Sequence, residues 1–110
     1  MRLPWQLVAV AGDSMRPTLT DGDWLLVRTV RDGAAAAPGD VLLLSRPDRA
    51  ELLLVKRAVR RVGAAWWVAG DNPAGSDDSR LFGPVPDALV HGRVLARYHP
   101  SPRWLGRRRP

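Results

Sequence analysis

The chain carries an apolar segment that ends in two adjacent cations, Glu51-Leu52-Leu53-Leu54-Val55-Lys56-Arg57-Ala58-Val59 (residues 51–59). Its Leu- and Val-rich composition predicts a β-strand, in which successive side chains point to opposite faces. Lys56 then shares an apolar face with Leu54 and Ala58, while Arg57 points to the other face. Burial disfavours a charged ammonium, so we expect the pKa of Lys56 to be lowered and its amine to accept a proton. In the alternative, Lys56 and Arg57 are two surface cations at the end of a strand.

Short apolar segments of this kind recur along the chain, separated by Gly, Pro and Asp residues. They predict strands at residues 5–10, 23–30, 40–45, 51–60, 65–69 and 92–98. This spacing is typical of a mainly β fold, a compact and mostly antiparallel barrel or sandwich. The chain of 110 residues is long enough for a single domain with a core of modest size.

The composition excludes several kinds of site. The chain has no cysteine, which rules out disulfides, thiol catalysis and cysteine-based zinc sites. Its two histidines, His91 and His99, have no carboxylate-rich cluster beside them, so we expect no metal and no other cofactor. We expect both histidines to be strand-edge or surface residues rather than partners of a catalytic serine.

Positive charge is concentrated at the end of the chain. The formal net charge is +6, and the segment 101–110 contributes four arginines to it. We expect a domain at residues 1–100 and then a basic, flexible tail at 101–110, either solvated or touching an anionic membrane surface or an acidic partner. The apolar runs are far shorter than the roughly 20 residues that a membrane-spanning helix needs, and the start lacks the pattern of an export signal. We therefore expect a cytoplasmic protein without a transmembrane anchor.

A serine lies in a constrained turn near the start of the chain, in the stretch Ala-Gly-Asp-Ser-Met-Arg-Pro-Thr-Leu (residues 11–19). Ser14 follows an apolar run and precedes Pro17, whose ring fixes its own φ, while Gly12 permits backbone shapes that other residues resist. Such a bend after a strand exposes one hydroxyl and directs backbone N–H groups towards it. The segment is either an ordinary turn or the site of a nucleophile, which a neutral Lys56 would activate.

A polar segment follows the fifth predicted strand, Gly-Asp-Asn-Pro-Ala-Gly-Ser-Asp-Asp-Ser-Arg-Leu-Phe-Gly-Pro-Val (residues 70–85). Residues of these types commonly form loops that have no chemical role. Read with the other two segments, it offers a partner for a buried amine, because Ser76 or Ser79 can orient that amine. Asp78 and Arg80 can clamp the loop through charge-assisted hydrogen bonds. The glycine at its start lets the backbone pass close to the lysine or to a substrate.

Together these three segments resemble the type I signal peptidase family. The resemblance rests on Ser14-Met15 with Pro17-Thr18-Leu19, then Lys56-Arg57, then Gly70-Asp71-Asn72 with Ser76, Asp78, Ser79, Arg80 and Phe82-Gly83-Pro84-Val85, all in the order of the family. It covers about residue 8 to residue 86. It implies a serine endopeptidase with a Ser–Lys dyad on a signal peptidase/LexA-like antiparallel β catalytic core.

The resemblance also implies a role for each matching residue. Ser14 is the nucleophile and Lys56 the general base, while Ser76 orients Lys56. Asp78 and Arg80 maintain the structure of the polar segment at residues 70–85, which we call the third segment. The backbone N–H of Ser14 donates to the oxyanion, a contribution of about 3 kcal/mol. Some members carry a hydroxyl two residues before the nucleophile as a second donor. This chain has a glycine there, so a second donor comes from the backbone or is missing.

The resemblance further suggests a substrate. We expect the protein to lack the N-terminal anchor and the large accessory β domain of many members, and the chain is similar in size to anchorless proteases that remove an N-terminal propeptide from nickel superoxide dismutase. We therefore expect the nickel superoxide dismutase precursor as the partner, with the nickel belonging to that substrate. One alternative is an anchorless protease of the same kind that acts on other precursors. Another is a repressor-type self-cleaving protease. The chain begins almost at the nucleophile turn, and this argues against that alternative.

A non-enzymatic alternative is a small basic β module that binds nucleic acid or a membrane through its arginines and tryptophans. Tryptophans can stack on bases when they are exposed. We expect at least Trp66 or Trp67 to face the core instead, since both lie in a predicted strand. We accordingly expect no nucleic-acid partner.

Overall fold

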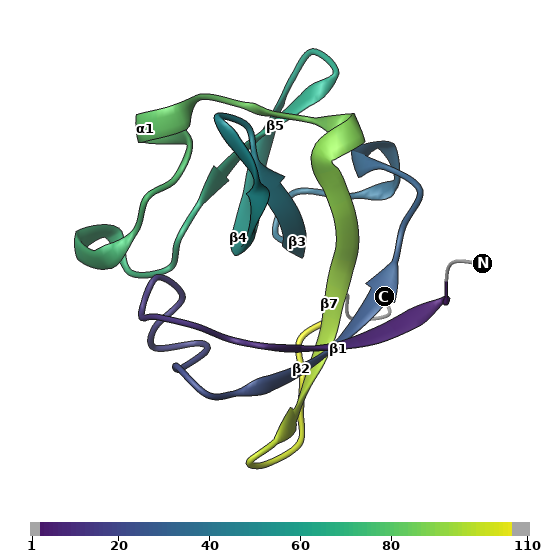
Figure 1. The fold of residues 1–110 in the computed structure, drawn as a ribbon, viewed down its shortest axis with the longest axis vertical. Helices are drawn as coiled ribbons and strands as arrows, with labels where there is room; N and C mark the ends of the chain where they lie inside the picture. The colour runs from purple at the N-terminus through teal and green to yellow at the C-terminus, as the bar shows by residue number, and fades with distance from the viewer. Residues whose placement is uncertain (1–2, 107–110) are drawn as a thin grey trace.

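Antiparallel strands dominate the regular secondary structure of the chain in the computed structural model, which describes residues 3–106 (Figure 1). The strands are β1 (Trp5–Ala9), β2 (Trp24–Thr29), β3 (Val41–Arg46), β4 (Arg49–Val62), β5 (Ala65–Ala69), β6 (Val85–Pro86), β7 (Val90–His99) and β8 (Arg103–Trp104). They join in one sheet in the order β1-β2-β7-β3-β4-β5-β6, with β8 paired to β7. The prediction of a mainly β, antiparallel fold is confirmed.

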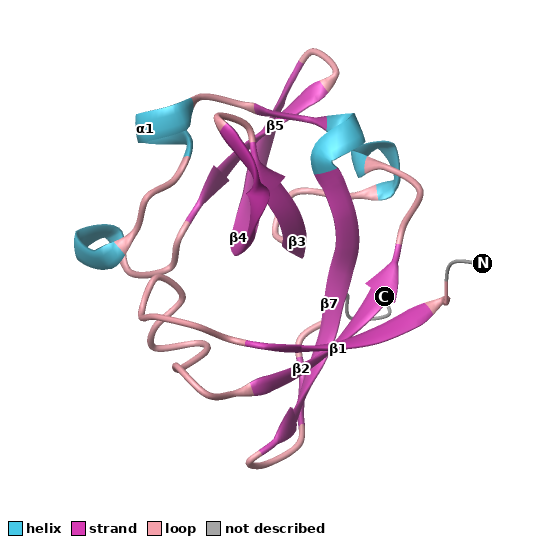
Figure 2. Cartoon of the chain, in the orientation of Figure 1, coloured by secondary structure: helices cyan, strands magenta, loops and turns pink. Residues whose placement is uncertain are grey.

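All six strands expected from the sequence are present. Their ends differ from the prediction by at most two residues, as in β4, which is predicted over 51–60 and observed over 49–62. β6 and β8 are additional strands of two residues each, too short to show the alternation that marks a strand in a sequence. Short helical turns lie between the strands (Figure 2), namely η1 (Gly33–Ala35), η2 (Pro73–Gly75), α1 (Ser79–Phe82) and η3 (Asp87–Leu89).

β3 lies between two hydrophobic clusters. Its residues Val41 and Leu43 belong to the first cluster, whereas Leu42 and Leu44 belong to the second. All four are at most 2% exposed, because β3 is covered on both faces, and a continuous apolar run is typical of such a strand. The first cluster also contains Val10, Met15, Leu19, Leu25, Val27 and Val94, and the second contains Ala58, Trp66, Val68, Val85 and Val90.

β4 connects the two halves of the sheet and leaves one of its edges open. Up to Arg57 it pairs with β3, and from Arg57 onward it pairs with β5. Before Arg57 the other edge of β4 has no strand neighbour among residues 3–106, and neither has the outer edge of β1, the first strand in the sheet order. Both edges therefore present backbone groups that another extended chain can pair with.

The segment predicted to be a tail begins with a strand. β8 pairs with Ala96 and Arg97 of β7, and the Leu105 N–H donates to the Leu95 carbonyl at 2.7 Å. Residues 107–110 of the predicted tail lie outside the described residues, and the division of the chain at residue 100 stays a prediction. Every helix within residues 3–106 is too short or too polar to cross a membrane.

Candidate active site

The Lys56 side chain is buried in β4, on the face that the strand pattern predicts. Only 3% of the residue is exposed, and it lies opposite Leu42 of β3 and on the same face as Ala58 of the second cluster. Burial lowers the pKa of Lys56 below its ordinary value, and the negative charges of Asp78 and Asp77 offset this only in part. An amine with a lowered pKa is neutral, and able to accept a proton, over a wider range of pH.

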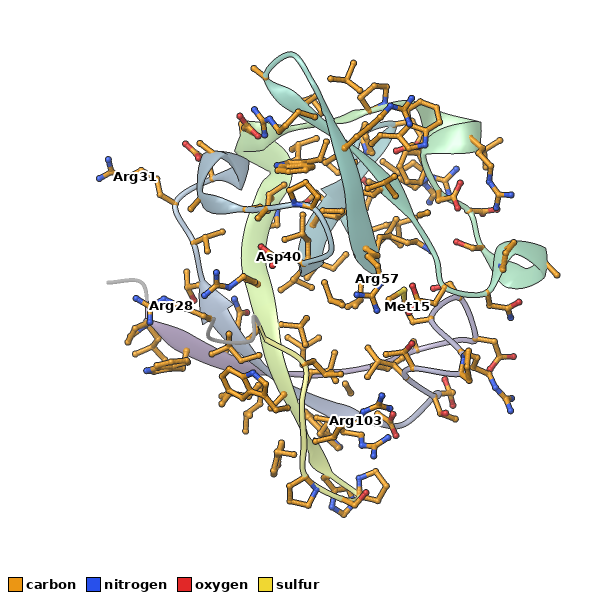
Figure 3. All side chains as sticks on the ribbon, turned by 180° about the vertical axis from the view of Figure 1, so that it is seen from behind. Met15, Arg28, Arg31, Asp40, Arg57 and Arg103 are labelled. Carbon is orange, nitrogen blue, oxygen red and sulfur yellow. The ribbon has the colours of Figure 1, made fainter. Side chains whose placement is uncertain are left out.

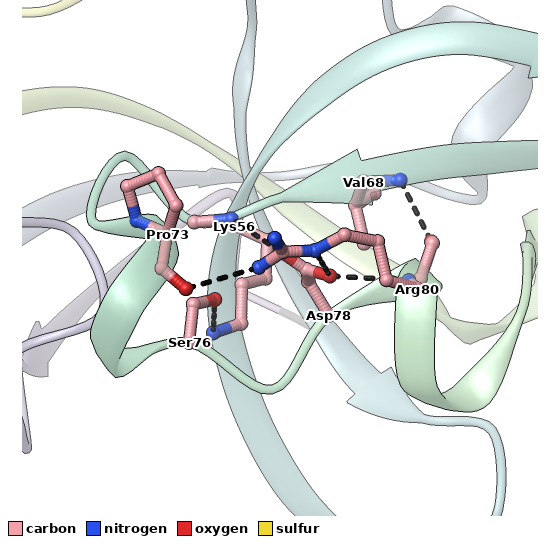
Figure 4. Close-up of polar contacts among 8 residues, drawn as sticks. Lys56, Val68, Pro73, Ser76, Asp78 and Arg80 are labelled. Atoms are coloured by element: carbon pink, nitrogen blue, oxygen red, sulfur yellow. Dashed lines mark hydrogen bonds and ion pairs between the residues drawn. The ribbon is translucent and has the colours of Figure 1, made fainter.

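One serine of the third segment contacts this amine, and the other serves a different purpose. Lys56 Nζ donates a hydrogen bond to Ser76 Oγ at 3.0 Å (Figure 4). Ser79 is buried, and its Oγ accepts from the Val68 N–H at 2.8 Å, which fastens the start of α1 to β5. Of the two serines that the loop sequence offers as partners for the amine, the structure brings Ser76 to it.

Asp78 and Arg80 form an ion pair with two side-chain hydrogen bonds in the third segment (Figure 4). Arg80 Nε donates to Asp78 Oδ1 at 2.9 Å, and Arg80 Nη2 donates to Oδ2 at 3.1 Å and to the Pro73 carbonyl at 3.2 Å. The Gly70 N–H donates to Asp78 Oδ2 at 3.3 Å. Burial alone would raise the pKa of Asp78, but the hydrogen bonds from Arg80 and Gly70 outweigh it, so this pKa lies below its ordinary value. The charged carboxylate therefore ties Gly70, at the start of the segment, to the first turn of α1.

Ser14 lies in the loop after β1 and lines a cavity of about 100 Å³ together with Lys56. We call it the small cavity; Ala9 and Ala11 also line it. Met15, the residue after Ser14, is 1% exposed and anchors the loop in the first hydrophobic cluster, pointing into the interior in Figure 3. Within residues 3–106 the Ser14 hydroxyl is not hydrogen-bonded to Lys56, and the Ser14 N–H donates to no protein acceptor. The structure thus brings Ser14 and Lys56 to one cavity and leaves the Ser14 N–H available.

The third segment packs directly against the Ser14 loop. The Asn72 N–H donates to the Ser14 carbonyl at 2.9 Å, and the Asn72 side-chain amide donates to the Asp13 carbonyl at 3.1 Å. A Cβ built on Gly70 would lie 2.5 Å from the Ser14 carbonyl oxygen and would overlap Ser76 Oγ. Because only glycine fits between them, Gly70 sets how closely the Ser14 loop approaches the segment that carries Ser76.

The sequence does not reveal a second network, which joins all three segments. Arg57 Nε donates to Asp71 Oδ1 at 2.9 Å and Arg57 Nη2 to Asp71 Oδ2 at 2.8 Å, while Thr18 Oγ1 donates to the same Oδ2 at 2.6 Å. The hydrogen bonds from Arg57 hold the pKa of Asp71 below its ordinary value, despite partial burial. The sequence signal that bears on this network is the strand alternation. It points Arg57 away from the face of Lys56 but does not say which residue Arg57 contacts there.

Other residues considered from the sequence lie outside these networks. His91 Nε2 is 2.7 Å from the Oγ of Ser45, a buried residue of β3, and His99 is exposed. Trp66 is 1% exposed, which confirms that at least one of Trp66 and Trp67 faces the core. Within residues 3–106 no group of three or more His, Cys, Asp or Glu side chains is arranged to hold a metal ion.

Proteins similar to this chain bear the names of proteases. The chain is 31% identical to mitochondrial inner membrane protease subunit 1 of Schizosaccharomyces pombe, an alignment that covers 92% of this chain and 78% of the relative. It is 30% identical to subunit 1 of Xenopus tropicalis, covering 86% and 70%. It is 35% identical to the mitochondrial ATP-independent inner membrane protease subunit 1a of Arabidopsis thaliana, covering 88% and 71%.

These relatives correct one prediction. A cytoplasmic location was expected because the apolar runs are short, but the relatives are named as proteases of the mitochondrial inner membrane. The prediction is therefore wrong, since the length of an apolar run limits which helices can span a membrane and does not decide where a protein works.

The family assignment rests on the same part of the chain as the site. A model of the Peptidase S24-like family matches residues 5–85, the range that includes the Ser14 loop, Lys56 and the third segment up to Val85. The antiparallel β fold and the protease names of the relatives agree with this match. The chain belongs to the Peptidase S24-like family.

Proposed function

We propose that this peptidase is a serine endopeptidase in which Ser14 attacks the scissile carbonyl and neutral Lys56 takes the hydroxyl proton. The observation that carries the proposal is a single buried lysine that lines one cavity with Ser14. The peptide nitrogen leaves with the proton held by Lys56, and an ester forms between Ser14 Oγ and the acyl group. Water then attacks the ester, Lys56 accepts a proton from it, and the acid product leaves as Ser14 regains its proton.

Ser76 is proposed as the residue that orients the base. Its Oγ accepts from Lys56 Nζ at 3.0 Å, which restricts a long and otherwise flexible side chain. Asp78 and Arg80 act one step further away, because their pair holds the segment on which Ser76 lies. These three residues are positioning residues rather than groups that react.

The backbone N–H of Ser14 is proposed as an oxyanion donor. It has no protein acceptor within residues 3–106, so its hydrogen bond is available to the negative oxygen of a tetrahedral intermediate. One such donor is worth about 3 kcal/mol. The residue two positions earlier is Gly12, with a φ of 85°, and it offers no side-chain donor.

The substrate is proposed to be an extended segment of a precursor protein. The open edges of β1 and β4 flank the small cavity, since Ala9 comes from the first strand and Lys56 from the second. An extended peptide can pair with such an edge and place alternate side chains in pockets. A cavity of about 100 Å³ suits a small side chain next to the cleaved bond.

The names of the relatives point to precursors processed at a membrane, and we propose such precursors as the substrate class. Removal of a propeptide from nickel superoxide dismutase stays a prediction of the sequence resemblance. The assay therefore tests that precursor as one candidate substrate, together with precursors that are delivered to a membrane.

The test compares the wild type with the variants Ser14→Ala, Lys56→Met and, as a matched control, Ser101→Ala at an exposed position. Each is incubated with candidate precursors, and new N-termini are identified by mass spectrometry. We expect both site variants to lose at least about a thousandfold in cleavage rate, with the control unchanged and the circular dichroism spectra alike. Cleavage that survives in both site variants would refute the Ser–Lys mechanism.

A further inference from the structure

A second and larger cavity lies near the other end of β1. Its volume is about 370 Å³, and we call it the distal pocket. It is lined by Trp5 and Gln6 of β1, Thr29 of β2, Leu43 of β3, Leu53 of β4 and His91 of β7. A concave site of this size, mostly apolar and with a few polar groups, is typical of ligand binding.

The polar groups of the distal pocket are fixed by the fold. Leu43 pairs with Gly92 and Leu44 with Val90, so β7 carries His91 as one extra residue between these pairs. Such a bulge redirects a side chain, and here the His91 ring lines the pocket with its Nε2 2.7 Å from the Oγ of a buried serine, Ser45.

The Gln6 side chain of β1 donates to Thr29 Oγ1 of β2 at 3.5 Å. Both polar pairs join neighbouring elements of the described structure. The pocket therefore has defined walls rather than loose side chains, and its remaining lining is apolar or aromatic.

The distal pocket shares a lining residue with the small cavity of the candidate active site. Leu53 of β4 lines both cavities, and β1 lines the small cavity with Ala9 and the distal pocket with Trp5. Four residues of an extended chain span about 14 Å, and side chains four positions apart point to the same face. A peptide bound along the open edge of β1 can therefore fill both cavities at once.

We propose that the distal pocket binds a large apolar side chain of the substrate, four residues from the side chain in the small cavity. The aromatic or long aliphatic class follows from the pocket's volume and its lining by Trp5, Leu43 and Leu53. This inference rests on the proposed function, because it assigns the pocket to the polypeptide being cleaved. It makes the distal pocket a specificity site that sets which bond lies at Ser14.

The test uses soluble peptides of alternating alanine and serine with one phenylalanine, moved along the peptide one position at a time. Mass spectrometry identifies the cleaved bond. We expect that bond to move with the phenylalanine at a constant spacing of about four residues, with cleavage about tenfold faster than in the peptide without phenylalanine. A cleaved bond that ignores the phenylalanine, or equal rates for all peptides, would overturn the proposal.

Two variants separate the pocket from general effects on the strand. Gln6→Trp fills the distal pocket, whereas Leu7→Trp adds the same side chain at the next position, which is 53% exposed and does not line it. We expect Gln6→Trp to abolish the preference for phenylalanine while it still cleaves the peptide without phenylalanine, and Leu7→Trp to keep the preference. A preference that persists in Gln6→Trp contradicts the assignment.

A binding measurement distinguishes failure of this inference from failure of the proposed function. The Ser14→Ala variant is titrated with the same peptides by calorimetry, alone and combined with Gln6→Trp. About tenfold tighter binding of the phenylalanine peptides, lost in the double variant, supports the pocket even if the wild type cleaves none of them. Equal affinities for all peptides overturn the pocket and leave the Ser–Lys proposal to its own test.

Discussion

Replacing Gly70 with alanine tests whether the close approach of the Ser14 loop and the third segment matters for activity. The added Cβ would lie 2.5 Å from the Ser14 carbonyl oxygen, and ordinary contact begins at 3.4 Å. The two segments must therefore separate by about 0.9 Å, the difference between these distances. That movement strains the hydrogen bond from the Asn72 N–H to the Ser14 carbonyl. It also strains the hydrogen bond from Lys56 Nζ to Ser76 Oγ.

Two magnitudes follow from this displacement. Crowding of this kind costs about 1–3 kcal/mol in the free energy of unfolding. A misplacement of about 1 Å in a catalytic arrangement costs on the order of a hundredfold in rate. We therefore expect Gly70→Ala to remain folded but to lose most of its kcat/KM for any substrate of the wild type.

The assay pairs steady-state cleavage with urea unfolding of the same preparations. The matched control is Gly75→Ala, in the same segment, where the added Cβ meets only the side chain of Asn72. We expect the control to stay within about threefold of the wild type in kcat/KM. It disturbs only the exposed hydrogen bond from the Asn72 side chain to the Asp13 carbonyl, whereas the hydrogen bond from the Asn72 N–H to the Ser14 carbonyl stays. A folded Gly70→Ala protein with wild-type activity would refute the reasoning.

Three further predictions concern the charged groups. Because a buried Lys56 has a lowered pKa, kcat/KM should rise with pH through that pKa. The single lysine in the chain allows a lysine-specific ¹³Cε NMR titration to check that the same group titrates; titration at the ordinary lysine pKa would contradict the burial argument. Between the lowered native pKa of Lys56 and the ordinary lysine pKa, the unfolded state holds a proton that the native state has released. In this pH range the stability of the wild type should therefore rise with pH. Lys56→Met should remove that dependence and raise the free energy of unfolding near neutral pH, as urea titrations at several pH values would show. Finally, Asp71→Asn should lower that free energy by about 1–3 kcal/mol, because it leaves the Arg57 donors and Thr18 incompletely paired. Asp48→Asn should cost less, because Asp48 pairs with Arg46 at an exposed site. Equal losses in the two variants, measured by thermal unfolding, would mean that the Arg57–Asp71 pair has no special structural role.

The sequence predicts best where a local period exists. Alternation along β4 correctly buries Lys56, because the direction of a strand side chain depends only on its position in the strand. The six main strands follow from the same rule together with the turn residues between them. Within the third segment no such period exists, so the choice between Ser76 and Ser79 as the partner of the amine needs coordinates.

Contacts between distant segments are the part that the sequence cannot supply. Arg57 and Asp71 are 14 positions apart, and Thr18 and Asp71 are 53 apart, and no pattern links positions at such separations. The distal pocket is of the same kind, since its walls come from five strands. The sequence does not predict the strand β8 for a different reason. This strand lies in an arginine-rich segment, and the composition of that segment indicates a solvated end.

The double burial of β3 has a consequence for how the protein folds. Val41 and Leu43 complete one cluster and Leu42 and Leu44 the other, so neither half of the sheet can bury its apolar face without the same strand. We therefore expect the two halves to gain structure in a single cooperative transition. Ser14 is attached to the first cluster through Met15, and Lys56 lies on the face of β4 that carries Ala58 of the second cluster. A chain that is still emerging or partly unfolded would then lack the pairing of the proposed nucleophile with the proposed base, and we expect proteolytic activity to appear only when folding is complete.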